Sequence, residues 1–223
     1  MEAPRSGKLY STTEADILYD IIRNRRDVRG NRFLNKPLEE TVVRRVMSAA
    51  LHAPSVGFSQ PWEFVLIRDA AVKRAVYDSY VAEKDRSVSL FADDKQQTYQ
   101  QLKLEGILEA PLNIAVFYKP SSGPVLGQTA MQEVGLYSVV CAVQNMWLMA
   151  RALNIGLGWV SILDPEHVGR ILGAPEQNRL VAYLCLGYTD GFYTQPELEL
   201  LQWEKRKLEE AVILEEGYGR GLV

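Results

Sequence analysis

The feature that most constrains the fold is a stretch from about Thr129 to Leu153, which is predicted to form one long helix. Its apolar residues do not keep to one side of that helix; they include Leu136, Val139, Val140, Val143, Met146, Trp147 and Met149. A helix that is apolar on every face has to be surrounded, either in the middle of a protein or at a subunit interface. The chain must therefore build layers on more than one side of this segment.

Helix and strand patterns alternate around this segment. Ser11–Glu14 has the form of a capping box and starts an amphipathic helix that ends near Arg25, and Pro37 is expected to open a second helix. Strands are predicted at 62–67, 113–118, 159–162 and 180–186, and a short helix at 165–172. We expect an α+β fold in which a mixed sheet is flanked by helices in three layers, as a single domain over residues 1–223.

Two further segments have less regular patterns. Residues 70–110 are predicted to be helical but polar, and the charged part at about 80–105 could serve as a lid. Asn154–Gly158 is expected to close the long apolar helix as a turn. Its Gly156–Gly158 portion lacks the third glycine and the preceding strand of a dinucleotide fingerprint, and we reject that interpretation.

The composition argues against several classes of function. A formal net charge of −3 offers no basic field for a polyphosphate backbone, so we expect no nucleic-acid partner. We see no leader pattern and no run near the roughly 20 apolar residues of a membrane helix, so we expect a cytoplasmic protein. His52 and His167 lie far apart, and no metal site is expected. Cys141 and Cys185 are predicted to be buried free thiols.

Three arginines and one aspartate crowd the segment Arg25-Arg26-Asp27-Val28-Arg29. Guanidiniums are rigid five-donor forks that suit a phosphate monoester. If the preceding helix extends through this segment, Arg25 and Arg29 lie on one face of it. The same pattern also fits a solvated charge cluster that interacts with the carboxyl end of the helix. From these residues alone, both interpretations stay open.

A second candidate is the loop Ala53–Pro61, which is too rich in proline and glycine for regular structure. Its backbone N–H groups and the side chains of Ser55 and Gln60 suit an anion or the edge of a heterocycle. An ordinary connection between a helix and a strand would have a similar sequence. This loop therefore points to a ligand only in combination with other features.

Together these motifs resemble the flavin-dependent nitroreductase superfamily over nearly the whole chain. The arginine segment, Pro54–Phe58, Lys103–Pro111 and Gly158–Pro165 are similar to the BluB family of 5,6-dimethylbenzimidazole synthases, which belongs to cobalamin biosynthesis. The resemblance implies a nitroreductase-like fold and an intertwined homodimer with FMN at the subunit interface. It also implies that reduced FMN is the substrate, which O2 breaks down to 5,6-dimethylbenzimidazole with release of erythrose 4-phosphate.

The resemblance assigns contacts with FMN to individual residues. The residues that match are Arg25, Arg26, Arg29, Ser55, Gln60, Ser161 and Arg206. The three arginines of the segment would hold the phosphate and ribityl end, and the loop side chains would contact the cofactor from another side. Arg206 matches a late basic residue that reaches the phosphate; a plain surface charge beside Glu204 and Glu209 is the alternative.

The resemblance implies catalytic roles for Asp27 and Ser161. Asp27 stands where ordinary nitroreductases commonly have a serine, and the resemblance implies that it transfers protons during fragmentation. We expect its arginine neighbours to favour the ionised carboxylate. Ser161 matches a serine near the reactive edge of the flavin, with a role in hydrogen bonding and proton relay. Phe58 replaces a common asparagine and would make the site tighter and more apolar.

Two other functions fit the same fold and stay open at this point. One is an NAD(P)H-dependent nitroreductase or enone reductase, because fold does not fix function. The other is a non-catalytic flavin-binding protein. The source of electrons is also open, since the protein could use NAD(P)H itself or receive reduced FMN from a separate flavin reductase.

Overall fold

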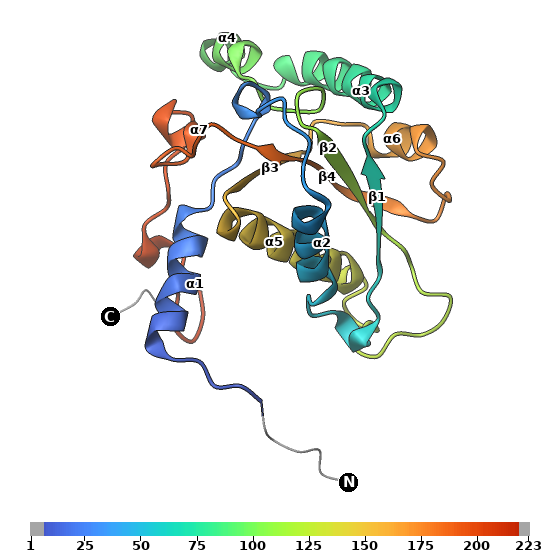
Figure 1. Cartoon of the computed structure of the whole chain (residues 1–223), viewed down its shortest axis with the longest axis vertical. Helices are drawn as coiled ribbons and strands as arrows, with labels where there is room; N and C mark the ends of the chain where they lie inside the picture. Colours follow the sequence, from blue (N-terminus) through green and yellow to red (C-terminus); the bar gives the residue numbers. More distant parts are fainter. Residues whose placement is uncertain (1–6, 219–223) are drawn as a thin grey trace. The chain divides into compact units, whose positions relative to one another are not determined.

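The computed structural model describes residues 7–218 and divides the chain into two compact units, Met1–Phe192 and Tyr193–Val223. The first unit contains the sheet and six of the helices (Figure 1). The second contains the short helix α7 (Glu197–Leu200) and a 3-10 turn at Glu209–Ala211. The single domain predicted over residues 1–223 stays a prediction.

The first unit is built on a four-stranded sheet in the order β1-β2-β4-β3. Its strands are β1 (Trp62–Ile67), β2 (Leu112–Tyr118), β3 (Ile155–Val160) and β4 (Arg179–Tyr188). Neighbouring strands pair antiparallel throughout. β1 and β3 therefore form the two outer edges, with β2 and β4 between them.

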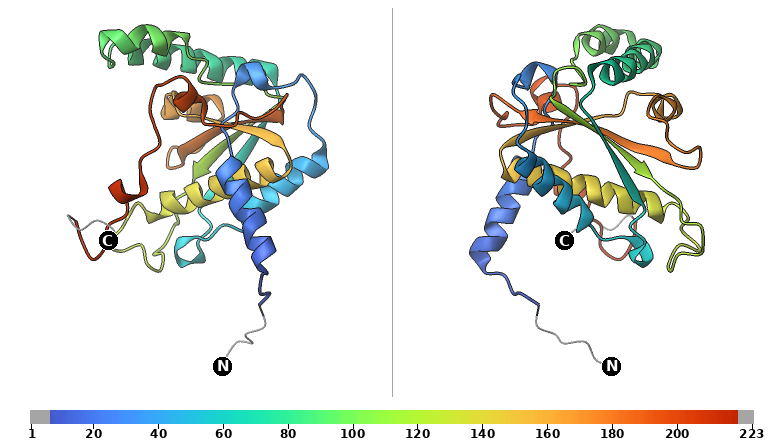
Figure 2. Two further views of the ribbon diagram at one scale, coloured as in Figure 1. Left: turned by 90° about the vertical axis from the view of Figure 1, so that its left-hand side faces the viewer. Right: turned by 45° about the vertical axis from the view of Figure 1, so that its right-hand side comes forward.

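Helices cover both faces of this sheet, as two of the views show (Figure 2). α2 (Glu40–Leu51) and α5 (Val134–Ala152) pack on one face, while α3 (Ala70–Val88) and α6 (Pro165–Ile171) pack on the other. α4 (Asp93–Gln101) contacts α3, and α1 (Thr12–Asn24) contacts α5. The expected three layers and the α+β class are thus confirmed.

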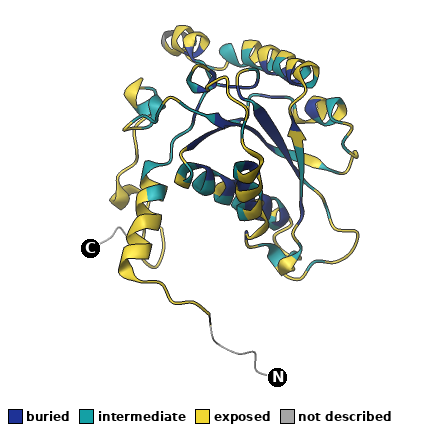
Figure 3. Ribbon diagram, in the orientation of Figure 1, coloured by how far each residue is buried: buried dark blue, intermediate teal, exposed yellow. Residues whose placement is uncertain are grey.

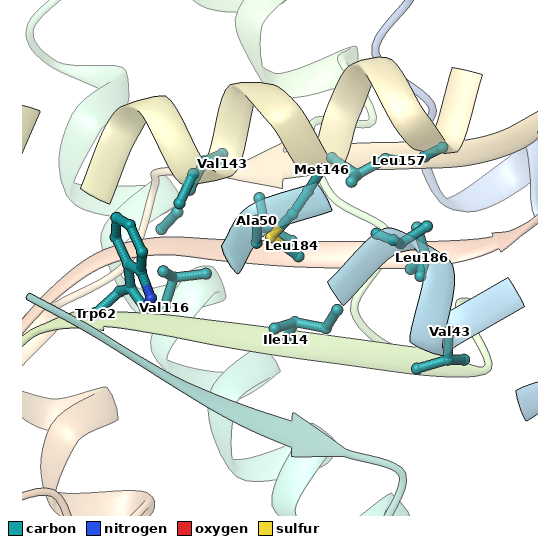
Figure 4. Packing of buried hydrophobic residues seen from close by; sticks show 14 of the residues in the cluster. Val43, Ala50, Trp62, Ile114, Val116, Val143, Met146, Leu157, Leu184 and Leu186 are labelled. Carbon is teal, nitrogen blue, oxygen red and sulfur yellow. The ribbon is translucent and has the colours of Figure 1, made fainter. Parts of the chain in front are cut away.

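The alternation of side chains along β2 divides the core into two clusters. Leu112, Ile114 and Val116 face α2 and α5, where the packing includes Val143 and Met146 (Figure 4). Ala115 and Phe117 face the other way, toward α3 and α6. Because helices cover both faces, the central strands carry apolar residues on both sides, and Asn113 of β2 is a buried polar exception. Figure 3 shows the same division, with buried strands between partly exposed helices.

The expectation of a mixed sheet needs correction for the described strands, which contain no parallel pair. α5 connects β2 to β3, and these two strands run in the same direction. β4 inserts between them and is antiparallel to both. This pairing comes from contacts between distant parts of the chain, so alternating helices and strands could not predict it.

Several element boundaries also differ from the sequence prediction. α2 begins at Glu40 rather than Pro37, because residues 37–39 stay extended and Leu38 packs against the core. The polar helical stretch ends at Gln101 instead of continuing to residue 110. By contrast, the capping box is confirmed: Ser11 Oγ accepts from Glu14 N, and Glu14 Oε2 accepts from Ser11 N. β1 has the predicted bounds.

Candidate functional site

The candidate site is centred on residues 25–30, here named the Asp27 segment. α1 ends at Asn24, and Arg25 and Arg29 both have extended backbone angles. The segment runs beside the outer edge of β3, where Val28 N donates to Leu157 O at 3.1 Å. The helix therefore does not extend through this segment, and Arg25 and Arg29 do not share a helical face. The chain turns from helix to an edge pairing because β3 offers backbone partners there.

Asp27 holds a fixed position between the strand and an arginine. Its Oδ1 accepts a hydrogen bond from Trp159 N at 3.1 Å, and its Oδ2 accepts one from Arg29 Nε at 3.1 Å. The Arg29 side chain is only 11% exposed, whereas that of Asp27 is 32% exposed. Each carboxylate oxygen thus has a donor, and the remaining surface of the carboxylate can meet a ligand.

Burial raises the pKa of the Asp27 carboxyl above its usual value, even though part of the side chain remains exposed. Arg29, the Trp159 N–H group and Arg25 all act in the opposite direction, but the loss of hydration outweighs them. Arg29 and Arg25 thus favour the ionised form, as expected, but burial has the larger effect on the pKa. A raised pKa suits a carboxyl group that has to bind and release a proton.

Two glycines of β3 make the close approach of the Asp27 segment possible. A Cβ atom at Gly158 would lie 2.1 Å from the carbonyl oxygen of Val28, and one at Gly156 would lie 2.9 Å from Val28 Cγ1. Residues 155–158 were expected to form a turn, but they belong to the strand. Glycine is needed there because another backbone packs directly against the strand.

Arg25 and Arg26 lie against α5. The Arg25 guanidinium stacks over the Trp147 ring, with Cζ 4.4 Å from the ring centroid, and Trp147 Nε1 donates to the Arg26 carbonyl at 3.3 Å. Arg26 Nη1 donates to the carbonyls of Arg23 and Arg25 at 2.9 and 2.7 Å. One function of Arg26 is therefore to satisfy carbonyl groups at the carboxyl end of α1, as one sequence interpretation proposed.

Ser161 directly follows β3 and is exposed. It comes two residues after Trp159, whose N–H group binds Asp27. The structure therefore places both proposed catalytic residues along the same outer edge of the sheet. Their roles in catalysis stay predictions.

The motif Lys103–Pro111 supports the Asp27 segment from another side. Gly30 N donates to the Glu105 carbonyl at 2.7 Å. The Glu105 side chain is buried and forms an ion pair with Lys103, and its Oε2 accepts from Ile107 N at 2.7 Å. Lys103 also pairs with Glu109 at 2.8 Å. Sequence reasoning recognised this motif through resemblance but did not predict that it touches the arginine segment.

The Ser55–Gln60 loop has an unusual backbone. Gly57, Phe58 and Gln60 have φ angles of 55°, 53° and 49°, in the left-handed region. Ser55 Oγ accepts from Gln60 N at 3.1 Å, and Val56 N donates to Ser138 Oγ at 3.1 Å. These contacts hold Ser55 inside its own turn and anchor the loop to α5.

Within one chain, this loop and the Asp27 segment lie at opposite edges of the sheet. The loop leads into β1, whereas the Asp27 segment borders β3. With two strands between those edges, the spacing is roughly 14 Å. Their contacts on α5 give a similar separation, since Ser138 and Trp147 are roughly 13 Å apart along a helix that rises 1.5 Å per residue. The structure thus brings Asp27, the three arginines and Ser161 to one edge, and Ser55 and Gln60 to the other.

Comparison with known proteins identifies the family. The model of the Nitroreductase family matches residues 22–188, which include both edges of the sheet.

The chain belongs to the nitroreductase family.

A 5,6-dimethylbenzimidazole synthase from Rhodospirillum rubrum is 42% identical over 205 residues, covering 91% of this chain and 96% of that protein. A BluB-like flavoprotein from Clostridium difficile 630 has a TM-score of 0.63 at 21% identity, covering 86% of this chain and 99% of the other. A nitroreductase with bound FMN from Bacteroides fragilis has a TM-score of 0.59 at 20% identity, covering 88% and 96%. The two structural likenesses support the fold.

The sequence of this nitroreductase-family chain also supports predictions about metal ligands, membrane-spanning helices and cysteines. Among residues 7–218, no group of three or more His, Cys, Asp or Glu side chains could hold a metal ion. Within the same described part, no helix is long and apolar enough to cross a membrane. Cys141 and Cys185 are free thiols, and Cys185 is buried. Arg206 belongs to the second unit, and its predicted contact with the phosphate stays a prediction.

Proposed function

We propose that this protein breaks down reduced FMN with O2 to 5,6-dimethylbenzimidazole, the lower ligand of cobalamin, with release of erythrose 4-phosphate. The observation that carries the proposal is the 42% identity with a 5,6-dimethylbenzimidazole synthase over nearly the full length of both chains. A nitroreductase with bound FMN has the same fold, so the fold alone does not distinguish flavin breakdown from a reductase reaction. The geometry around Asp27 therefore also bears on the proposal.

The residues at the β3 edge fit a flavin phosphate. Arg25, Arg26 and Arg29 carry guanidiniums within one extended, half-buried segment, and such forks match the oxygens of a phosphate. When bound, reduced FMN supplies the electrons that O2 takes up. The protein binds and orients that substrate, and its own side chains move protons.

We assign proton transfer to the Asp27 carboxyl. The Trp159 N–H group and Arg29 fix its two oxygens, so its orientation is set before a ligand arrives. Burial raises its pKa, which brings the group closer to the range where a carboxyl both accepts and donates protons near neutral pH. The Ser161 hydroxyl, at the end of the same strand, would donate a hydrogen bond to the flavin and relay a proton.

We also propose that the active form is a homodimer in which one flavin contacts two copies. In this arrangement a second chain brings Ser55 and Gln60 to the β3 edge of the first, since the two regions are roughly 14 Å apart in one chain. α1 supports this arrangement, since it has no buried residue and exposes Ile17, Leu18 and Ile22 (Figure 3). An apolar hollow of about 520 Å³ adjoins it, lined by residues that include Leu18, Ile21, Ala49 and Met149.

The shared site can be tested by mixing two inactive variants. Asp27→Asn removes the proposed proton-transfer group at the β3 edge. The double variant Ser55→Ala/Gln60→Ala removes the proposed flavin contacts of the loop. If each site uses the two regions from different copies, a mixed dimer has one intact site, and refolding an equal mixture should restore about a quarter of wild-type activity. No restored activity, with mixed dimers demonstrated by mass spectrometry, would show that each site draws on a single copy.

We further propose that residues 80–105, which include the end of α3 and all of α4, act as a lid. Lys84 Nζ donates to the carbonyls of Gln100 and Leu102 at 3.0 and 2.9 Å, which ties the end of α4 to α3. The lid is thus joined through Lys103 to the motif that supports the Asp27 segment. A closed lid would exclude water from the flavin during its reaction with O2.

The deciding experiment is a single turnover of the purified protein with chemically reduced FMN, which is then exposed to air. Because the FMN is already reduced, the experiment needs neither NAD(P)H nor a separate flavin reductase. We expect 5,6-dimethylbenzimidazole and erythrose 4-phosphate, identified by chromatography and mass. Quantitative recovery of intact FMN would reject the proposal, and NAD(P)H oxidation would then distinguish a reductase from a flavin-binding protein.

A further inference from the structure

The last turns of α5 hold the Asp27 segment through two side chains. Trp147 Nε1 donates to the Arg26 carbonyl at 3.3 Å, and Arg151 Nε donates to the Asn24 carbonyl at 2.9 Å. Trp147 and Arg151 lie four residues apart and therefore on one face of the helix. α5 thus fixes the backbone on both sides of Arg25.

The Trp147 ring also contacts the Arg25 side chain. The guanidinium lies 4.4 Å from the ring centroid. Stacking uses the face of the guanidinium, whereas its N–H groups point outward in the plane of the group. The contact therefore orients the cation without itself consuming an N–H donor.

Trp147 is itself held in place. Its ring lies 6.2 Å from that of Trp159, at an interplanar angle of 52°. Such a tilted pair of aromatic rings is a favourable arrangement. Trp159 in turn contributes the N–H group that binds Asp27. The two paired tryptophans thus contact both charged residues, Trp147 through its ring to Arg25 and Trp159 through its backbone N–H group to Asp27.

We propose that Trp147 is a positioning residue that orients Arg25 toward the phosphate of the flavin. The inference rests on the proposed function in that the ligand is FMN. Without the ring, Arg25 would lose a contact that restricts its rotamers, so more side-chain entropy would be lost when the phosphate binds. With the ring, that ordering is already present in the folded protein.

The test compares the affinities for FMN and riboflavin, which differ only by the phosphate. Trp147→Leu should lower the FMN affinity by about three- to tenfold, as expected for losing a cation–π contact, while the riboflavin affinity changes little. Trp147→Phe keeps an aromatic ring and should retain most of the preference for FMN. Arg25→Ala should lower the preference as well, and adding Trp147→Leu to it should have little further effect.

Tyr188→Leu is a matched control, because the Tyr188 ring stacks against a cation outside the Asp27 segment, Lys36, at 4.2 Å. Its preference for FMN should equal that of the wild type. An unchanged preference in Trp147→Leu, or an equal loss for both flavins, would overturn the inference and leave the proposed function intact. Equal affinity of the wild-type protein for the two flavins would overturn the phosphate assignment and the role of Trp147 together.

Discussion

The Asp27 segment and the Ser55–Gln60 loop are both proposed to contact the flavin, but they are held in place in different ways. The Asp27 segment depends on residues more than a hundred positions away, among them Leu157 and Trp159. The loop is organised mainly by its own turn, in which Phe58 N donates to Ser55 O and Gln60 N to Ser55 Oγ, at 3.0 and 3.1 Å.

The backbone conformations of the two regions also differ. The described angles of the Asp27 segment are extended and cost no strain. The loop places Phe58 and Gln60 in the left-handed region, where a side chain costs about 1–2 kcal/mol. The comparison indicates that the β3 edge is set by tertiary packing, whereas the loop holds local strain that contacts with a ligand or a second copy would have to offset.

The largest effect is expected for Asp27→Asn. The amide has nearly the same shape but cannot take up the proton, so the rate of product formation should fall at least a hundredfold while FMN still binds. Single-turnover product analysis and flavin titration measure these two quantities separately. Asp190→Asn is a matched control, because Asp190 also pairs with an arginine, Arg32, at 2.7 Å. Full activity of Asp27→Asn would remove Asp27 from the chemistry.

The regions also differ in how far the sequence could predict them. Local signals predicted the capping box of α1 and the bounds of β1, because both depend on neighbouring residues. The arginine segment and the loop were recognised as candidate binding elements from their composition. Their separation across the sheet could not be predicted, since it follows from the insertion of β4 between β2 and β3.

The same limit explains the errors at the β3 edge. Gly156 and Gly158 suggested a turn, but each is small because Val28 packs against it from a distant part of the chain. The arginine neighbours of Asp27 are visible in the sequence and favour its ionised form as expected, whereas the burial that raises its pKa is not visible there. The contacts of Trp147 were missed for a similar reason, as an apolar residue in a buried helix gives no sign that it touches an arginine.

The next prediction concerns the dependence of the Asp27 segment on β3. Gly158→Ala would place a methyl group 2.1 Å from the Val28 carbonyl oxygen, so either the strand or the segment must move. We expect a loss of about 1–3 kcal/mol in the free energy of unfolding, as for other overpacked sites, together with a loss of turnover. Urea unfolding and the single-turnover assay measure these changes.

Gly169→Ala is the control for that substitution. Gly169 lies inside α6, and the nearest atom to its added Cβ is Ala174 Cβ at 4.0 Å. Alanine favours a helix over glycine by up to about 1 kcal/mol, so this variant should be as stable as the wild type or slightly more stable. If Gly158→Ala behaved in the same way, the close packing between Val28 and β3 would not be required.

The pH dependence of stability tests whether burial or the neighbouring arginines have the larger effect on the pKa of Asp27. Because its pKa is raised in the folded state, the folded protein binds more protons than the unfolded chain. The contribution of Asp27 to stability is therefore present at low pH and is lost as the pH rises from about 4 through the folded pKa. The free energy of unfolding of the wild type relative to Asp27→Asn should thus fall with rising pH. A rise over that range would show that the arginines outweigh burial.

The smallest effect is expected in the loop. Phe58 is 81% exposed and has a φ of 53°, a conformation that asparagine adopts more readily than an aromatic residue. If the ring contacts nothing beyond its own chain, Phe58→Asn should raise the free energy of unfolding by about 0.5–1 kcal/mol through relief of strain. If the ring instead packs against a second copy or the flavin, the variant should lose stability, and the loss should grow with protein or FMN concentration.

Of these two results for Phe58→Asn we expect the loss of stability, because an exposed aromatic ring on a strained backbone has no benefit in an isolated chain. Thermal unfolding across a range of protein concentrations, with and without FMN, distinguishes the two and shows whether the loop completes a site built around Asp27.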